Sequence, residues 1–270
     1  MADRASLLAD LTAEGDALDA VVAGLDEAAW TTATPAEGWT IAHTIAHLEG
    51  TDRQALLAVT DPAAFGTALS AVLDRLDTLV DDEARAGAAT APALLLERWR
   101  TGRTALAEAL GAAGEDRFPW FGPPMKAASM ATARLMETWA HGVDVTDALG
   151  LPVLVSGRLR HVAHLGVRTR DFAFAQHGLT PPAEPFRVEL TAPDGPVWTW
   201  GPDDAAQRVT GPALDFCLRV TRRRHRDDLA LEATGGEADR WLDVAQAFAG
   251  PAGADRPPAG APRGAGRRQP

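Results

Sequence analysis

The feature that most limits what this chain can fold into is a helical pattern that continues almost unbroken to about residue 180. Apolar residues, mostly Ala and Leu, recur there every three to four positions, and no strand-like alternation interrupts them. Breaks fall where turn residues gather, at 34–38, 60–62 and 115–125. The pattern predicts helices near residues 5–25, 40–59, 68–83, 91–112, 126–149 and 156–177. The first part of the chain is therefore expected to be a mainly α domain.

The hydrophobic pattern changes from helical to strand-like after the prolines near residue 182. The segments FRVELTA, VWTW and QRVT alternate as short strands do, with turn residues between them, and two helical runs follow at 212–221 and 236–250. This predicts a small α+β domain. We expect three parts in all: a helical bundle at 1–182, the α+β domain at 183–250 and a disordered tail at 251–270, whose Pro/Gly/Ala/Arg sequence cannot bury a core.

Composition narrows the class of function. Of the 270 residues, 46% are apolar, which is typical of a globular protein. The formal net charge of −11 argues against nucleic acid or an anionic membrane as a partner and favours a small-molecule ligand or substrate. The N-terminal residues look like neither a secretory signal nor a membrane span, so a cytoplasmic location is expected. The single cysteine, Cys217, lies in an apolar run and is expected to be a buried thiol.

A polar stripe stands out on the expected helix at 126–149. Glu137, His141 and Asp144 are spaced i, i+4, i+7, so their side chains point the same way. Either that face of the helix is exposed to solvent or it binds a ligand. Glu137 lies within an apolar run, where an unpaired carboxylate would be costly to bury, and this favours a metal.

Two ligands on one helix do not make a metal site, and the expected helix at 40–59 supplies further candidates. His43 and His47 are four residues apart, and their spacing does not distinguish them. Two imidazoles and one carboxylate with an open position are the ligand set of a catalytic zinc site. The competing interpretation is that these histidines are hydrogen-bonded core residues.

At these residues the chain resembles the DinB-like metalloprotein superfamily, in particular its mycothiol-dependent maleylpyruvate isomerase branch. The resemblance is carried by WTIAHTIAHL, with a Trp eight residues before a His-Leu pair, and by the Glu-x-x-x-His of ETWAH. It implies a four-helix bundle that holds a divalent metal, usually zinc, with His47, Glu137 and His141 as ligands and His43 outside the set. Later segments, such as GPALDFCLRVTRRR, extend the likeness to an SCP2-like C-terminal domain.

Other candidate residues have two interpretations each. Asp144 either hydrogen-bonds a ligand histidine or is a solvated helix residue. Arg222, in the charge run TRRRHR, is either solvated or binds a substrate carboxylate, as the resemblance suggests. Arg168 shares a helical face with two histidines and either approaches the pocket or lies on the surface.

Aromatic residues complete the candidate site. Trp120 and Phe121 are expected to form a pocket wall, whereas Trp39 and Trp139, which we place on the ligand helices, are expected to pack in the core.

The resulting hypothesis is a metal-dependent enzyme that uses mycothiol as a thiol cosubstrate to isomerise or thiolate a small electrophilic substrate. The composition suggests a GC-rich, actinobacterial host, where mycothiol is the common thiol. A thiol-independent hydrolase or lyase and a non-enzymatic ligand-binding protein stay open, and a monomer or homodimer is expected. C-terminal segments also resemble a module named for wyosine base formation, a tRNA modification that the acidic composition does not favour.

Overall fold

The computed structural model describes residues 3–250 and 255–260. Contacts within the chain divide it into two compact units, the first ending at Leu154 and the second beginning at Val155.

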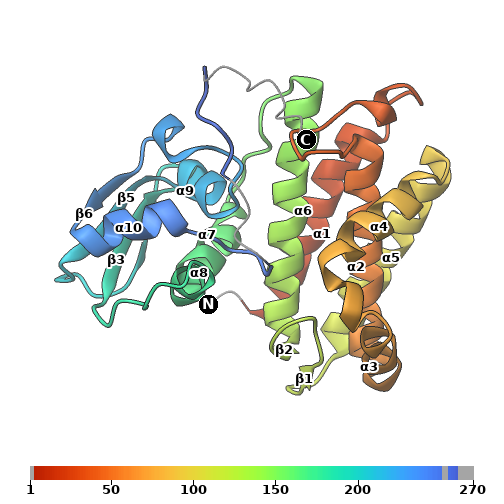
Figure 1. Cartoon of the computed structure of the whole chain (residues 1–270), viewed down its shortest axis with the longest axis horizontal. Coiled ribbons are helices and arrows are strands. Elements are labelled where there is room, and N and C mark those ends of the chain that lie inside the picture. Colours follow the sequence, from red (N-terminus) through yellow and green to blue (C-terminus); the bar gives the residue numbers. More distant parts are fainter. Residues whose placement is uncertain (1–2, 251–254, 261–270) are drawn as a thin grey trace, which may run out of the picture. The chain divides into compact units, whose positions relative to one another are not determined.

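Four long helices lie side by side in the first unit and form a bundle (Figure 1). They are α1 (Arg4–Val22), α2 (Ile41–Thr60), α5 (Pro92–Ala112) and α6 (Ala127–Leu149). Helix α2 packs most extensively on α5, and α6 packs most extensively on α1. The shorter helix α4 (Leu76–Ala88) lies against α2. The expected helical bundle is confirmed.

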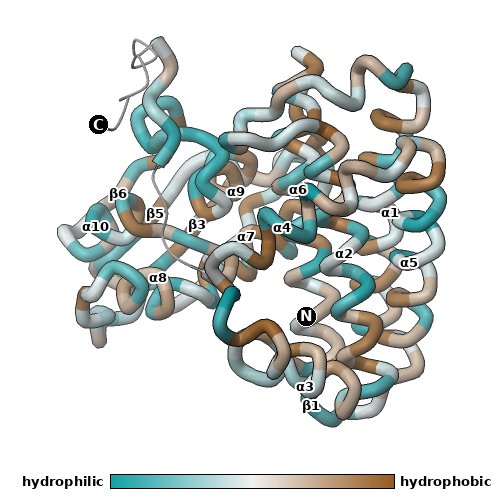
Figure 2. Tube along the Cα trace, turned by 45° about the vertical axis from the view of Figure 1, so that its right-hand side comes forward, coloured by the Kyte–Doolittle hydropathy of each residue, from teal (hydrophilic) through white to brown (hydrophobic). Residues whose placement is uncertain are grey.

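The core of the bundle is apolar. Ile41, Ile45 and Trp99 are almost fully buried together with Leu18 and Val145. Apolar and polar stretches alternate along the bundle helices (Figure 2), as expected of helices with one buried and one exposed face. The polar residues that occur inside this bundle therefore need an explanation beyond helix formation.

The single helix expected at 68–83 is wrong. The structure has α3 (Pro62–Ser70), a 3-10 turn at Leu73–Arg75 and then α4. Helix α3 starts directly after α2 because the Asp61 side chain accepts a hydrogen bond from the backbone N–H of Ala64, and Pro62 occupies the first helical turn.

Helix α6, which carries the polar stripe, has well-defined ends. A hairpin of two short strands, β1 (Arg117–Phe118) and β2 (Met125–Lys126), precedes it within the segment expected to be a loop. At its other end Gly150 adopts a left-handed conformation (φ 65°), and the N–H of Leu151 bonds back to the carbonyl of Thr146.

The second unit contains a four-stranded sheet with the order β4-β3-β5-β6. Its strands are β3 (Phe186–Thr191), β4 (Val197–Trp200), β5 (Gln207–Pro212) and β6 (Glu232–Thr234). The central pair, β3 and β5, is parallel, and the two outer pairs are antiparallel. Three of these strands match the expected ones, and β6 was not predicted. The expected small α+β domain is confirmed.

Four helices accompany this sheet: α7 (Leu159–Arg168), α8 (Arg170–Gln176), α9 (Ala213–Val220) and α10 (Gly236–Val244). The single helix expected at 156–177 is wrong, because it breaks at Thr169, whose hydroxyl donates to the carbonyl of Gln246 at 2.8 Å. Helix α7 packs so closely on α9 that any side chain at Gly166 would collide with Val220. The second unit therefore includes these helices and starts before the boundary expected near residue 182.

The expected disordered tail lies partly outside the described residues, at 251–254 and 261–270. Of the residues between them, Asp255 pairs with Arg219 at 3.0 Å. Among the helices that the structure describes, none is both long and apolar enough to cross a membrane.

Candidate metal centre

The start of α2 separates the two histidines that the spacing left equivalent. Nδ1 of His43 lies 2.8 Å from Oγ1 of Thr40 and accepts a hydrogen bond from the Thr40 backbone N–H at 3.3 Å. His43 therefore belongs to the N-terminal cap of the helix. His47 lies one turn further along, and its side chain faces α6.

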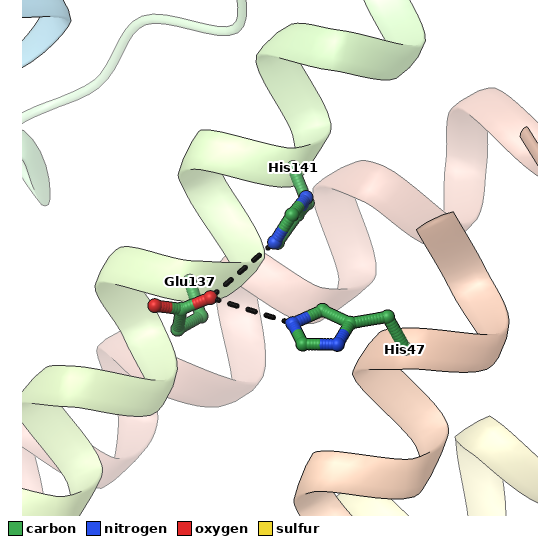
Figure 3. Close-up of side chains that lie close together, drawn as sticks. All are labelled: His47, Glu137 and His141. Carbon is green, nitrogen blue, oxygen red and sulfur yellow. Dashed lines mark ion pairs between the residues drawn. The ribbon is translucent and has the colours of Figure 1, made fainter. Parts of the chain in front are cut away.

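Glu137 and His141 of α6 meet His47 of α2. Their polar ends converge in Figure 3, where the two dashed lines meet at the Glu137 carboxylate. Glu137 Oε2 lies 3.7 Å from Nε2 of His47 and 3.3 Å from Nε2 of His141. One ligand atom from each of the three residues lies within 4.8 Å of the others.

These three residues fit a divalent cation. Ligand atoms bonded to zinc at about 2.0–2.2 Å in a tetrahedron lie roughly 3.3–3.6 Å apart, which is close to the two separations that Glu137 makes. The donor chemistry also fits, because two imidazoles and one carboxylate are a ligand set of catalytic zinc. The described part of the chain offers no other comparable cluster of three His, Cys, Asp or Glu side chains.

Burial and hydrogen bonding together set the protonation states of His47 and Glu137. Burial lowers the pKa of His47 to about 4, an effect that the hydrogen bond to Glu137 only partly opposes, so His47 is neutral at pH 7. Burial alone would raise the pKa of Glu137, but hydrogen bonds from His141 and His47 outweigh it and hold this pKa well below its usual range. A neutral imidazole and an ionised carboxylate are the forms that bind metals.

Asp144 contacts the candidate ligand His141 from the opposite side of its ring. Its Oδ2 lies 3.2 Å from Nδ1 of His141, and the residue is almost fully buried. The solvated alternative for Asp144 therefore does not hold. A carboxylate at Nδ1 orients the ring, whose other nitrogen, Nε2, lies 3.3 Å from Glu137.

Trp39 differs from the sequence expectation. It lies in the loop before α2, half-buried, where its ring stacks on His141 (centroids 5.9 Å apart, 15° between planes) and tilts against His47 at 5.3 Å. Its Nε1–H donates to Asp81 of α4 at 2.9 Å. Trp39 therefore lines the candidate centre instead of the core, whereas Trp139 is buried as expected. No sequence pattern indicated its partner, Asp81.

Trp120 and Phe121 lie in the β1–β2 hairpin and contact an aromatic residue of α3. The ring of Trp120 stacks on Phe65 at 5.8 Å, and the ring of Phe121 meets Phe65 edge-on at 5.4 Å. The structure thus brings these two residues together with each other and with Phe65, at the end of the bundle where α6 begins (Figure 1). Their assignment as a pocket wall stays a prediction.

The two arginine candidates belong to the second unit. Arg168 is exposed at the end of α7. Arg222 is buried, in the left-handed backbone region (φ 57°), with Nη2 3.0 Å from Nε2 of His177 and Nε 3.8 Å from Oδ1 of Asp255. The solvated interpretation of Arg222 is therefore wrong, because folding encloses its side chain. Its proposed role toward a substrate stays a prediction.

Cys217 is buried in α9, as expected, and its thiol donates to the carbonyl of Leu159 at 3.4 Å. Burial raises the pKa of this thiol well above its usual value. It is not a source of thiolate at neutral pH.

The fold and this cluster define a class: helical-bundle proteins with a candidate divalent-metal centre between two helices. Residues 11–146, which include all three candidate ligands, match the model of the mycothiol maleylpyruvate isomerase N-terminal domain, and residues 182–234 match that of wyosine base formation. The chain belongs to the mycothiol maleylpyruvate isomerase N-terminal domain family.

Its relatives include two uncharacterized proteins of Mycobacterium tuberculosis, from strains CDC 1551 / Oshkosh and ATCC 25618 / H37Rv. Each is 58% identical over 257 residues, which cover 95% of this chain and all of the relative. Among solved structures, the fold is similar to that of the mycothiol-dependent maleylpyruvate isomerase and of a point mutant of it. The TM-scores are 0.57 and 0.58 and the identities 16% and 15%, over 86% of this chain and 93% of the other.

Proposed function

We propose that this protein is a metal-dependent enzyme that uses mycothiol as cosubstrate and transfers it to, or isomerises, a small electrophilic substrate. The observation that carries the proposal is the cluster of His47, Glu137 and His141, which lies inside the segment matched by the family model. Zinc is the first choice of metal, because two imidazoles and a carboxylate suit it.

The chain's residues would hold the metal and orient one another. His47 and His141 each offer Nε2, Glu137 offers a carboxylate oxygen, and Asp144 fixes the ring of His141 through Nδ1. A divalent cation bound there would lower the pKa of a coordinated thiol and hold the thiolate beside the substrate. Trp39 would cover one side of both imidazoles and limit the access of water.

The reactive sulfur would come from outside the chain. Cys217 is the only cysteine, and it is buried with a raised pKa in the second unit. An external thiol such as mycothiol supplies what the sequence lacks. We assign Arg222 to a substrate carboxylate, and Trp120, Phe121 and Arg168 to contacts with thiol or substrate, as parts of the same proposal.

An activity screen tests this proposal. Zinc-loaded protein is incubated with a panel of small electrophiles, with and without mycothiol, and with Glu137→Gln protein as the control. Turnover that requires both mycothiol and Glu137 supports the proposal. Turnover of an ester, amide or lactone without thiol would replace it with a hydrolase, and elimination without thiol would replace it with a lyase. Binding of an apolar ligand without any turnover would favour a non-enzymatic role.

A further inference from the structure

A second charged pair joins the two helices that carry the candidate ligands. Nε of Arg134, on α6, donates to Oδ1 of Asp52, on α2, at 2.8 Å. The two side chains are 3% and 5% exposed, so both charges are enclosed by the bundle. We call Asp52 and Arg134 the buried pair.

The buried pair lies next to the candidate ligands on both helices. Arg134 precedes Glu137 by three residues, about 4.5 Å along α6, and Asp52 follows His47 by five, about 7.5 Å along α2. The order of these contacts shows that α2 and α6 run antiparallel, with His47 opposite Glu137 and Asp52 opposite Arg134. Any sliding or rotation of one helix against the other moves the pair and the ligands together.

Stability alone does not explain a charged pair at this position. Enclosing two charges has a desolvation cost that their attraction rarely exceeds, and apolar replacements of similar volume are often neutral or stabilising. The pair is also incompletely satisfied, because the buried Nη2 atom of Arg134 has no hydrogen-bond partner among the described residues. What a buried pair can supply is register, because the hydrogen bond from Arg134 to Asp52 forms in only one arrangement of the two helices.

Register is what a centre divided between α2 and α6 requires. These helices pack more extensively on α5 and α1 than on each other, so a direct contact between α2 and α6 beside the candidate ligands bears on their mutual position. A metal site tolerates deviations of only about 0.2 Å in its ligand distances. A shift by one residue along a helix is about 1.5 Å, which would remove His47 from reach of the other two ligands.

We infer that Asp52 and Arg134 are positioning residues of the metal centre, which hold α2 against α6 in the register that brings His47 to Glu137 and His141. The inference rests on the proposed metal centre. It assigns the buried pair no contact with substrate.

The test compares the metal affinity and the folding stability of one variant. Asp52→Leu/Arg134→Met replaces the buried pair by apolar side chains, and cobalt binding and the thermal midpoint of metal-free protein are measured. We expect the midpoint to stay within a few degrees, while cobalt binds at least about tenfold more weakly, as for partners that orient a metal ligand, with a changed visible spectrum. The control is Asp19→Leu/Arg100→Met, a more exposed pair (17% and 46%) that joins α1 to α5 at 2.7 Å, because neither of these helices carries a candidate ligand. It should leave cobalt affinity unchanged.

Two further outcomes keep the test decisive. Unchanged cobalt affinity and spectrum in the Asp52→Leu/Arg134→Met protein, with wild type binding tightly, would overturn the inference and leave the metal centre standing. Wild-type protein that binds no cobalt would overturn the metal centre itself. Should the double variant not fold, Asp52→Ala removes the acceptor of the Arg134 hydrogen bond, and the exchange Asp52→Arg/Arg134→Asp restores a pair. Weakened cobalt binding in Asp52→Ala and recovery in the exchange variant support the inference, and wild-type affinity in Asp52→Ala refutes it.

Discussion

His43 and His47 provide a paired test of the candidate metal centre, because on the same helix His43 caps the N-terminus and His47 is a candidate ligand. His43→Ala removes the acceptor of the Thr40 N–H at the helix N-terminus, and His47→Ala removes a candidate ligand. Loss of an N-terminal cap interaction costs roughly 1 kcal/mol. For a chain of this size that lowers the thermal midpoint by about 2–4 °C.

The two variants should therefore differ in metal content. His43→Ala should retain close to one divalent metal per chain and lose about 2–4 °C. His47→Ala should lose most of its metal, because it removes one of the three candidate ligands. Metal content is measured by elemental analysis of purified protein. Thermal midpoints are measured after chelation, since bound metal itself raises the midpoint. Loss of metal from His43→Ala with retention in His47→Ala would refute the assignment.

Three further predictions follow from contacts around the two units. Asp144→Asn should weaken zinc binding by about 10–100-fold without unfolding the protein, because it removes the carboxylate from Nδ1 of His141. Competition with a chromophoric chelator measures the zinc affinity, and an unchanged affinity would contradict this prediction. Burial alone would raise the pKa of Asp255, but Arg219 and Arg222 hold it below the ordinary 3.8, so its contribution to stability is present above 3.8 and is lost as the pH falls through the lowered pKa. Asp255→Asn should accordingly flatten the fall of the thermal midpoint below about pH 5, and equal slopes in both proteins would disprove the coupling. Truncation after Gly250 should lower the thermal midpoint, since it leaves the guanidinium of Arg219 without Asp255, and an unchanged midpoint would show that this pair is dispensable.

The fold could be predicted from the sequence because its signals are local. Period-3.6 patterns identified the four bundle helices, and period-2 alternation identified β3, β4 and β5. The errors came from contacts that no local pattern contains. Asp61 starts α3 earlier than the apolar pattern indicates, and the break in the second expected helix falls at Thr169, whose hydroxyl bonds to Gln246, far along the chain.

The candidate site, too, could be predicted only where its residues share a local spacing on one helix. The stripe of Glu137, His141 and Asp144 follows from spacing on one helix, and the structure brings it to His47. The choice between His43 and His47 rested on family resemblance, because both have the same local spacing. Trp39 was assigned to the core since an apolar ring gives no sign of what it covers. In the sequence, Asp52 and Arg134 are indistinguishable from solvated charged helix residues. Only the packing of α2 and α6 pairs them inside the bundle.

Titration of cobalt-substituted protein with mycothiol shows whether the candidate centre binds a thiolate. If the open position of the centre is filled by a thiolate, mycothiol should produce a sulfur-to-cobalt charge-transfer band, and binding should release a proton near neutral pH, because the free thiol has a pKa of about 8.5. The Glu137→Ala protein should show neither signal. A cobalt spectrum and a thermal midpoint that stay unchanged in millimolar mycothiol, together with turnover of an ester, amide or lactone without thiol, would show that the protein is a hydrolase and not a mycothiol-dependent enzyme.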